Sequence, residues 1–512
     1  MDIKKLTIDT SRFGWDEVTS VNRVSLTPAG CAVDMGDGSE RAEYVCQDYI
    51  INKLGRPHRN VSIMYTYYPK DKDWPQRISE AHADMKIDYQ WDFPYDDYPI
   101  YEGGIGRDHS GEPFQQMRDI RKHGEDVVLT ITIDCSLEDE YLIQIAKDMR
   151  TFGRIGLRIN HECAGTWFTH NQRYTYKEIA DFFVRFHNII KEYAPNVTTV
   201  FCSGFITEEG KMEQEDDFIE AFKVADVWSG DRYMALHAAW PFEICEKDSD
   251  RCYYQSVDSM KILFRDTVAR LREINGGVHK PFSASEFNID GDVTGPVLQG
   301  QGLIAFMKYL RDEKPDWFNS MAYYQFRDRG RLGLELEDPN NSGVGIEQPV
   351  LREYKEMIKD DYFNPGIKVI EELSSNLTEG SLNKSEKMSD IRMRWGGAED
   401  SDGLELKVRL EKEPVFFDML LPKEMNLMIS VNGRWFYKSP GVSIIDVMPA
   451  FYEEGSREVK PGEEISVLVF APPADGENPE TERSDWAENY YTVLSELPKF
   501  RIRYEANGVI EV

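Results

Sequence analysis

From residue 61 to about residue 360, short apolar segments alternate with segments whose apolar residues recur every three or four positions. The segment beginning at Thr175 is of the second kind, because Glu178 completes the spacing of a capping box and Ile179 and Phe182 begin an apolar stripe. A strand followed by a helix produces this alternation, so the sequence predicts a series of βα units.

The pattern predicts eight strand–helix pairs, and therefore an α/β fold of the (β/α)8 TIM-barrel type. The expected strands lie at residues 61–68, 86–93, 126–136, 155–160, 196–203, 225–234, 280–289 and 317–326. The expected helices lie near 74–84, 113–123, from Ser136, from Thr175, near 213–225, from Ser256, at 296–312 and near 349–359.

Beyond residue 365 the pattern changes to alternating apolar and polar positions, as in "LELKVRLE" and "EISVLVFA", separated by Pro, Gly and Asp. This period of two predicts strands with one buried face, and hence an all-β C-terminal domain of the β-sandwich type. The expected organisation is an N-terminal extension packed on the barrel (1–60), the barrel (61–365), a linker (366–390) and the sandwich (391–512).

Composition narrows the class of partner. The chain has 512 residues, of which 41% are apolar, enough for more than one core. Its formal net charge of -31 repels nucleic acid and anionic membranes, so a neutral partner such as a carbohydrate is expected. Exposed aromatic residues often bind sugars, and Trp435, Phe436 and Tyr437 are candidates in the β-domain, although consecutive aromatics on a strand more commonly divide between core and surface.

The seven cysteines are scattered and form no CxxC pair, so free thiols are expected, with Cys245 and Cys252 alone near enough in sequence for a local bridge. The first residues contain no apolar segment typical of a signal peptide, and no run of 18 apolar residues occurs. The chain as written is expected to be cytoplasmic, or secreted if a signal peptide has been removed.

Polar residues at the C-terminal ends of barrel strands converge on one mouth. Asp231 and Arg327 have opposite charges and are interpreted as an ion pair there. No histidine lies four residues after His161, so the HExxH zinc motif is absent, and neither a metal nor an organic cofactor is expected. The residues that end strands three to eight are Asp134; Arg158, Asn160, His161 and Glu162; Ser203; Asp231 and Tyr233; Glu286 and Asn288; and Gln325, Arg327 and Asp328.

Two glutamates, Glu162 after strand four and Glu286 after strand seven, face each other across the predicted mouth. Retaining cleavage of a glycosidic bond uses one carboxylic acid to protonate the leaving oxygen and one carboxylate, about 5–5.5 Å away, to attack the anomeric carbon. The acid must stay protonated and the nucleophile ionised, so the two need different surroundings. Arg158 and Tyr233 are the candidates for stabilising the charge of Glu286.

The segment "RINHECAGTWF" resembles glycoside hydrolase family 26, the β-mannanase family, which belongs to the large clan of retaining (β/α)8 hydrolases with catalytic glutamates after strands four and seven. The resemblance covers roughly residues 60–340 and implies that Glu162 is the acid/base and Glu286, in "SASEFN", the nucleophile. It also implies that His161 lies beside the acid/base and that Trp167 stacks on a sugar. In "ADVWSGDRY", Tyr233 corresponds to the donor to the nucleophile.

The chain departs from the family pattern at several positions near the expected cleavage point. Ile159 replaces the usual proline, His-Glu-Cys-Ala-Gly replaces His-Glu-Met-Asn-Gly, and Thr169-His170 replaces a second aromatic pair. Phe287-Asn288 follow the nucleophile where a small residue is common. Specificity for mannan therefore does not follow from the resemblance, and β-glucan or β-xylan remain alternatives.

The sequence thus predicts a retaining glycoside hydrolase of β-linked glycans, with Glu162 and Glu286 as its catalytic residues. Two alternatives stay open: a non-catalytic glycan-binding protein on the same scaffold, and a transglycosidase. Tyr323 and Tyr324 point in opposite directions on one strand, so at most one of them faces the mouth. The expected substrate-binding residues are Arg158, Asn160, His161, Trp167, Tyr233 and Tyr324.

Overall fold

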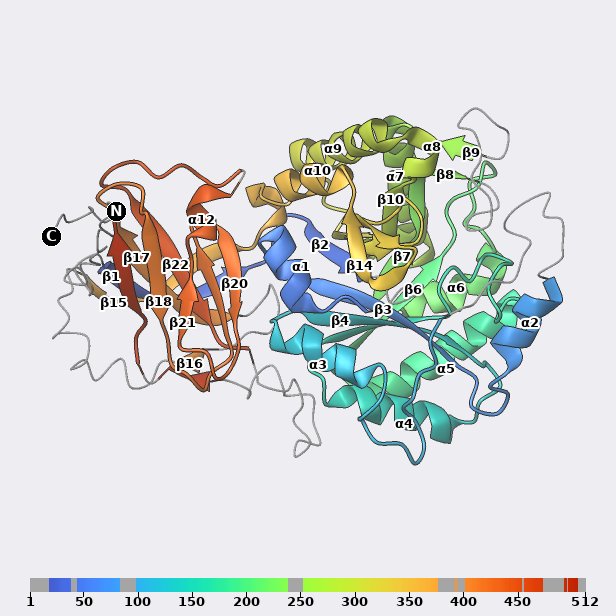
Figure 1. Cartoon of the computed structure of the whole chain (residues 1–512). Coiled ribbons are helices and arrows are strands. Elements are labelled where there is room, and N and C mark those ends of the chain that lie inside the picture. The colour runs from blue at the N-terminus through green and yellow to red at the C-terminus, as the bar shows by residue number, and fades with distance from the viewer. Residues whose placement is uncertain are drawn as a thin grey trace, which may run out of the picture.

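A computed structural model describes residues 18–37, 44–82, 98–237, 252–375, 392–393, 401–453, 455–472, 492–494 and 496–504. The chain forms a parallel β/α barrel and, beside it, a C-terminal region of antiparallel sheets (Figure 1). No helix among these residues has the length and apolar character needed to cross a membrane.

Eight parallel strands form the barrel, and it closes because the last strand pairs with the first, with Met321 opposite Val33. The predicted fold class is therefore confirmed. In order around the barrel, the strands are β2 (Ala32–Gly36), β3 (Asn60–Tyr67), β4 (Asp126–Ile133), β5 (Ile155–Ile159), β6 (Val197–Ser203), β7 (Val227–Gly230), β10 (Phe282–Ile289) and β11 (Ser320–Tyr323).

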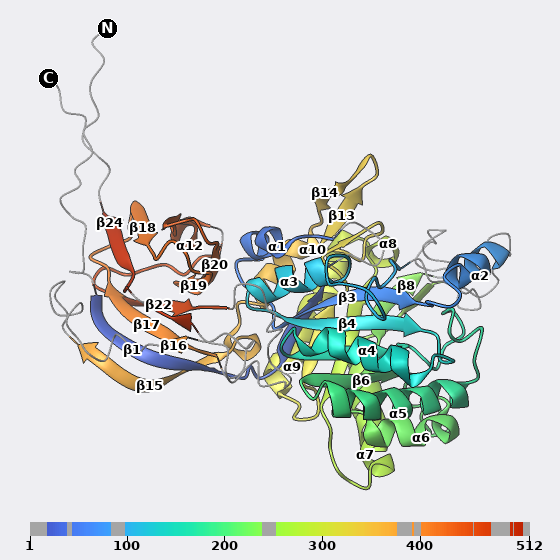
Figure 2. The same ribbon diagram turned by 90° about the horizontal axis from the view of Figure 1, so that it is seen from below.

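Helices cover the outside of the barrel (Figures 1 and 2). The capping box of α5 is present, since Glu178 N–H donates to Thr175 Oγ1 and Thr175 N–H donates to the Glu178 carboxylate. The helices are α1 (Gln47–Leu54), α2 (Trp74–His82), α3 (Phe114–Lys122), α4 (Asp139–Arg150), α5 (Tyr176–Tyr193), α6 (Glu215–Val224), α7 (Val257–Ile274), α8 (Gly291–Thr294), α9 (Pro296–Glu313) and α10 (Val350–Met357).

The first barrel strand differs from the prediction. It is β2, which lies inside the segment expected to be an extension, and the segment expected to be strand one is the second strand, β3. β2 has only five residues, and the charge of Asp34 interrupts its apolar run; Arg59 pairs with that carboxylate at 2.7 Å. The predicted strand at 86–93 lies outside the described residues. Strands three to eight keep their predicted numbers.

Ser136 does not cap the helix that follows β4. The helix α4 begins three residues later, at Asp139, with Glu138 in the N-cap position. Ser136 instead donates hydrogen bonds to Asp134 Oδ1 from its main-chain nitrogen at 2.9 Å and from its hydroxyl at 2.7 Å. An aspartate that accepts from the residue two positions on forms its own turn, and this turn competes with helix initiation.

The C-terminal region contains a six-stranded and a three-stranded antiparallel sheet, whose facing side chains share one apolar core. β1 comes from the start of the chain yet lies within the larger sheet, between β15 and β17. In order, the larger sheet is β15 (Gly366–Ser375), β1 (Val18–Thr27), β17 (Asp402–Arg409), β22 (Glu464–Phe470), β19 (Leu427–Val431) and β20 (Arg434–Lys438). The smaller sheet is β21 (Ile444–Asp446), β18 (Phe416–Leu420) and β24 (Lys499–Arg503).

Short elements complete the chain. Figure 2 shows the β13–β14 hairpin projecting from the barrel. These elements are β8 (Arg232–His237) and β9 (Cys252–Tyr254), β12 (Arg327–Asp328), β13 (Glu335–Asp338) and β14 (Asn341–Glu347), the 3-10 helix at Asp361–Phe363, β16 (Arg392–Met393) with β23 (Thr492–Val493), and α12 (Pro449–Tyr452).

The barrel and the sandwich meet through α1 and β20. Trp435 is buried in an apolar cluster between them, and its main-chain N–H donates to the carbonyl of Gly55 at 2.7 Å. Tyr437 lies against His123 of the barrel, with ring centroids 3.9 Å apart. Trp435, Phe436 and Tyr437 therefore serve packing, as expected when consecutive aromatics divide between opposite faces of a strand.

Candidate active site

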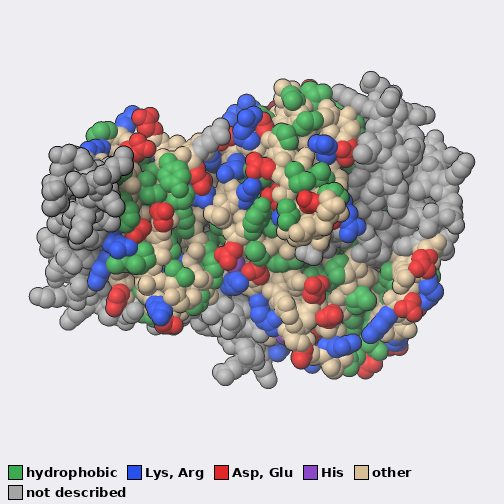
Figure 3. All heavy atoms as spheres, viewed as in Figure 1, with side chains coloured by type: hydrophobic (Ala, Val, Ile, Leu, Met, Phe, Trp, Pro, Cys, Tyr) green, Lys and Arg blue, Asp and Glu red, His purple; other side chains and the backbone are tan. Residues whose placement is uncertain are grey.

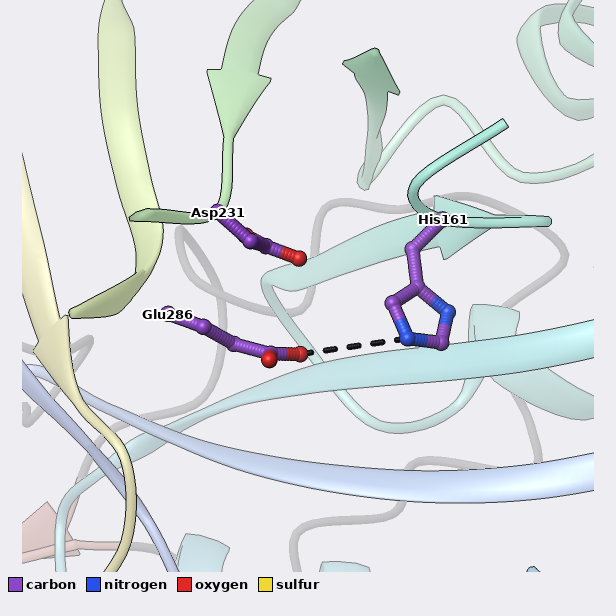
Figure 4. A group of neighbouring side chains, drawn as sticks. All are labelled: His161, Asp231 and Glu286. Atoms are coloured by element: carbon purple, nitrogen blue, oxygen red, sulfur yellow. Dashed lines mark ion pairs between the residues drawn. The ribbon is translucent and has the colours of Figure 1, made fainter. Parts of the chain in front are cut away.

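The candidate site lies at the carboxyl ends of the barrel strands, where β5 is followed by His161 and Glu162, β7 by Asp231, and β10 carries Glu286. In Figure 4 the side chains of His161, Asp231 and Glu286 point toward one another from these separate strands. The barrel topology therefore brings together residues that are up to 125 positions apart, as the strand-end analysis predicts.

Arg158 links the two acidic strand ends. One terminal guanidinium nitrogen lies 3.1 Å from Asp231 Oδ2, and the other donates to Glu286 Oε1 at 2.5 Å. Its Nε donates to the hydroxyl of Thr130 at 2.9 Å, and the side chain is fully buried. A guanidinium held at three points has little freedom to move, so Arg158 fixes the separation of the two carboxylates.

Glu286 receives two donors. Arg158 donates to Oε1, and the hydroxyl of Tyr233 donates to Oε2 at 2.8 Å. An ionised carboxylate is an acceptor at both oxygens, so this arrangement matches the anionic form. The predicted contacts of Arg158 and Tyr233 with Glu286 are present in the structure.

Glu162 has different surroundings. Burial raises its pKa well above the ordinary value, and the negative charges of Asp231 and Glu286 add to this effect. A hydrogen bond from Trp167 Nε1 to Oε2, 2.6 Å long, and the charge of Arg158 act in the opposite direction. The balance favours a protonated Glu162 next to an anionic Glu286.

Asp231 also titrates unusually. Burial raises its pKa to about 7, while the Arg158 guanidinium opposes that rise and the charge of Glu286 supports it. Cys202 Sγ lies 3.3 Å from Asp231 Oδ2 and donates to it. The site therefore contains three carboxyl groups and one permanent cation.

Asn160 connects two barrel strands. Its Oδ1 accepts from the main-chain N–H of Ile133 at 2.7 Å, and its Nδ2 donates to the carbonyl of the same residue at 3.2 Å. Both Asn160 (φ 45°) and Glu162 (φ 50°) have left-handed backbone conformations, which bend the chain sharply after β5. Asn160 was predicted to bind substrate, but the structure uses its amide to hold β4 against this bend.

His161 lies on the wall of the site. Its Nε2 is 3.8 Å from Glu286 Oε1, and its ring lies 4.4 Å from that of Phe168 and 6.1 Å from that of Tyr98. Burial, assisted by the nearby Arg158 charge, lowers the pKa of His161 well below its ordinary value. His161 is therefore a neutral imidazole beside the anionic Glu286.

Trp167 is half-buried and donates a hydrogen bond to Glu162, and its stacking on a sugar stays a prediction. Gly165 permits this position, because a Cβ at residue 165 would lie 2.5 Å from an indole carbon of Trp167. Below the indole is a small apolar cluster of Met64, Tyr98 and Phe168.

Tyr324 is the member of the strand-eight tyrosine pair that belongs to the site. Its ring meets Tyr233 edge-on with centroids 5.6 Å apart. Tyr323 points the other way and packs on Tyr354, with centroids 5.0 Å apart. Tyr323 is the last residue of β11 and Tyr324 follows it, so consecutive side chains point to opposite faces.

Asp231 and Arg327 do not pair with each other. Asp231 pairs with Arg158, and Arg327 pairs with Glu335 at 2.9 Å in the small sheet that contains β12 and β13. In the sequence, the charges and strand-end positions of Asp231 and Arg327 suggest that these two residues pair. They do not reveal that Arg158 extends from within β5 to reach Asp231.

Thr130 and Cys202 also contribute to the site and were not predicted. They lie on β4 and β6, on either side of β5, and hold Arg158 and Asp231 in place. Their position on the inner face of neighbouring strands was the available signal. Other predicted strand-end residues bind locally: Ser203 to the Gly204 carbonyl, Asn288 to the Leu332 carbonyl, and Gln325 to Asp328.

His161, Asp231 and Glu286 offer ligand atoms within 4.8 Å of one another, a spacing compatible with a metal ion. The Arg158 guanidinium, however, already contacts both carboxylates of this group. A divalent cation there would have to compete with a buried positive charge, so the donor set fits a metal poorly.

No protein-family model matches the sequence, and no curated protein matches it either. The fold resembles solved glycoside hydrolases at a distance. A GH26 β-mannanase from Bacteroides ovatus aligns with 10% identity and a TM-score of 0.40, covering 65% of this chain and 90% of that one. A family 39 glycoside hydrolase from Bacteroides cellulosilyticus WH2 aligns with 10% identity and a TM-score of 0.41, covering 87% of this chain and 81% of that one. The catalytic domain of a GH26 endo-β-1,4-mannanase from Bacillus sp. JAMB-750 has 14% identity and a TM-score of 0.39, covering 65% and 86%.

Proposed function

We propose that the chain is a retaining glycoside hydrolase that cleaves β-linked glycans or oligosaccharides. One observation carries the proposal: two glutamates of one site have opposite surroundings. Glu286 receives donors at both oxygens, whereas burial and neighbouring negative charge raise the pKa of Glu162. Retaining hydrolysis needs this pairing of an ionised and a protonated carboxyl.

In the first step, Glu162 protonates the glycosidic oxygen while Glu286 attacks the anomeric carbon, and the bond to the leaving sugar breaks. Proton transfer leaves Glu162 as a carboxylate. In the second step that carboxylate takes a proton from water, whose oxygen attacks the anomeric carbon and releases Glu286. Tyr233 and Arg158 hold Glu286 in its attacking position and stabilise its charge again when it is released.

The substrate we favour is a β-mannan-type glycan, with β-glucan and β-xylan as alternatives. The preference rests on the likeness of the segment from Arg158 to Phe168 to the β-mannanase family. Trp167, half-buried beside Glu162, is the proposed surface for stacking on a sugar ring.

The test is hydrolysis of a panel of β-glycans and activated aryl β-glycosides by wild type, Glu286→Ala and Glu162→Ala. We expect wild-type activity, and its loss in Glu286→Ala. With an activated substrate, azide should then yield the α-glycosyl azide from Glu286→Ala, because a single displacement inverts the anomeric centre. From Glu162→Ala it should yield the β-product, because attack then follows formation of the glycosyl–Glu286 intermediate.

The assignment of Glu286 as the nucleophile fails if full activity survives in Glu286→Ala. An inactive wild type across the whole panel, combined with measurable glycan binding, would instead identify the chain as a glycan-binding protein.

A further inference from the structure

A cavity lies where the barrel meets the sandwich. Its volume is about 440 Å³, within the range of about 300–1,000 Å³ typical of small-molecule sites. Gly55 precedes β3 and Ile358 follows α10, so the cavity is at the amino ends of the barrel strands, opposite the candidate active site. The segment from Asn432 to Trp435 and residues after α12 form the sandwich side.

The charge of this junction cavity is opposite to that of the chain. The whole chain carries a net charge of -31, yet five basic and two acidic side chains line the cavity. Figure 3 shows Lys and Arg side chains near this junction. The basic residues are Arg56, Lys355, Lys359, Arg434 and Arg457, and the acidic ones are Asp361 and Glu453.

The chain satisfies most of these cations, but not all. Lys359 pairs with Glu356 at 3.0 Å, Arg457 pairs with Glu463, and Arg56 donates to main-chain carbonyls. Lys355, which is partly buried, makes no hydrogen bond or ion pair with any part of the chain that the structure describes. The negative charges of Glu453 and Glu347 act on Lys355, but neither carboxylate forms an ion pair with it, so its N–H donors stay available to an anionic ligand.

Arg434 adds a second unsatisfied donor. It is buried, and Glu453 and the carbonyl of Asn52 accept from its terminal nitrogens at 2.8 and 2.9 Å. Its Nε has no hydrogen-bond partner among the described residues. This nitrogen is fully buried, so a ligand in the cavity would contact Arg434 through its terminal nitrogens instead. Trp435 and Leu468 give the same cavity an apolar wall.

We propose that the junction cavity binds a small organic anion of about monosaccharide or disaccharide size, whose carboxylate or phosphate contacts Lys355 and Arg434. Lys355 belongs to the barrel and Arg434 to the sandwich. The ligand would therefore join the two domains, and binding to the folded state alone would raise the melting temperature.

Isothermal titration calorimetry on the full chain tests this proposal with glucuronate, glucose 6-phosphate and neutral glucose as probes. We expect at least one anionic probe to bind at least tenfold more tightly than glucose. Comparison of the two anions distinguishes a carboxylate ligand from a phosphate ligand. The tighter probe should also raise the melting temperature of wild type.

Lys355→Met should weaken binding of that anion at least tenfold, because the substitution keeps the aliphatic stem and removes the charge. Lys308→Met, at an exposed lysine of α9 outside the cavity, is the matched control and should bind within twofold of wild type. Glu286→Gln should also bind within twofold, so the result does not depend on the proposed hydrolase activity. Equal binding of glucose and both anions, wild-type affinity in Lys355→Met, or loss of binding in Glu286→Gln would each overturn the proposal.

Discussion

The indole nitrogen of Trp167 donates a hydrogen bond to Glu162 Oε2 at 2.6 Å. This bond lowers the pKa of Glu162 and so opposes the stronger effect of burial. In Trp167→Phe we expect a higher Glu162 pKa, and the alkaline limb of the kcat/KM profile should move to higher pH because the acid keeps its proton longer. Loss of the contact should also reduce kcat/KM by roughly tenfold, equivalent to about 1.4 kcal/mol. An unchanged alkaline limb would show that Trp167 does not tune Glu162.

Gly165→Ala tests the same indole from the opposite side. The added Cβ would meet the Trp167 ring at 2.5 Å, so the indole must move away from Glu162. We expect kcat/KM to fall at least tenfold while the melting temperature falls by only a few degrees, since Trp167 is half-buried. Trp167→Phe should reduce the effect of Gly165→Ala in a double-mutant cycle. Additive losses would mean that residue 165 acts through another contact.

Arg158→Met should be harmful to both folding and activity. It leaves Asp231 and Glu286 as buried neighbouring carboxylates without a cation, a loss of about 3–5 kcal/mol. We also expect kcat/KM to fall at least about a hundredfold, because Glu286 loses a donor. Arg327→Met is the matched control, since it breaks another buried ion pair, with Glu335. It should lose comparable stability in urea denaturation and retain most activity per folded molecule. If both variants lost activity equally, Arg158 would contribute to stability alone and not to catalysis.

The protonation of Asp231 should make the unfolding free energy depend on pH. Its pKa is raised from 3.8 to about 7 on folding, mainly by burial, so the folded state binds this proton more tightly than the unfolded state. The resulting stabilisation is complete below pH 3.8 and is lost as the pH rises through about 7. Between pH 5 and 8, the unfolding free energy of wild type should therefore decline relative to that of Asp231→Asn. Parallel curves for the two proteins in urea melts across this range would contradict the assignment.

The sequence was sufficient for the parts of the site that lie at strand ends. Glu162 comes just after the apolar run of β5 and Glu286 lies within β10, and the barrel pattern predicts that both face one mouth. The sequence pattern does not predict the first strand, because β2 is only five residues long and contains the charged Asp34. The ion-pair partner of Asp34, Arg59, lies far from it in the sequence. Local periodicity does not record such a compensating ion pair.

The role of each polar side chain was harder to predict than its position. Asn160 and Arg158 are two residues apart, yet one amide holds a neighbouring strand while the guanidinium reaches across the barrel to Glu286. Arg158 lies within β5, whereas Asn160 and Glu162 follow it with left-handed backbone conformations, and an Asn or Glu residue in a sequence does not reveal a positive φ. Side-chain direction after the last strand residue therefore required the structure.

β1 is an inner strand of the sandwich sheet, although it precedes the whole barrel in sequence. On the ribosome, this strand emerges before either of its neighbours has been made, and the barrel must be synthesised before β15 and β17 are available. The larger sheet therefore cannot assemble until the barrel segment has been synthesised. A fragment starting at residue 391 would lack both β1 and β15, leaving an unpaired edge of β17 exposed to intermolecular pairing.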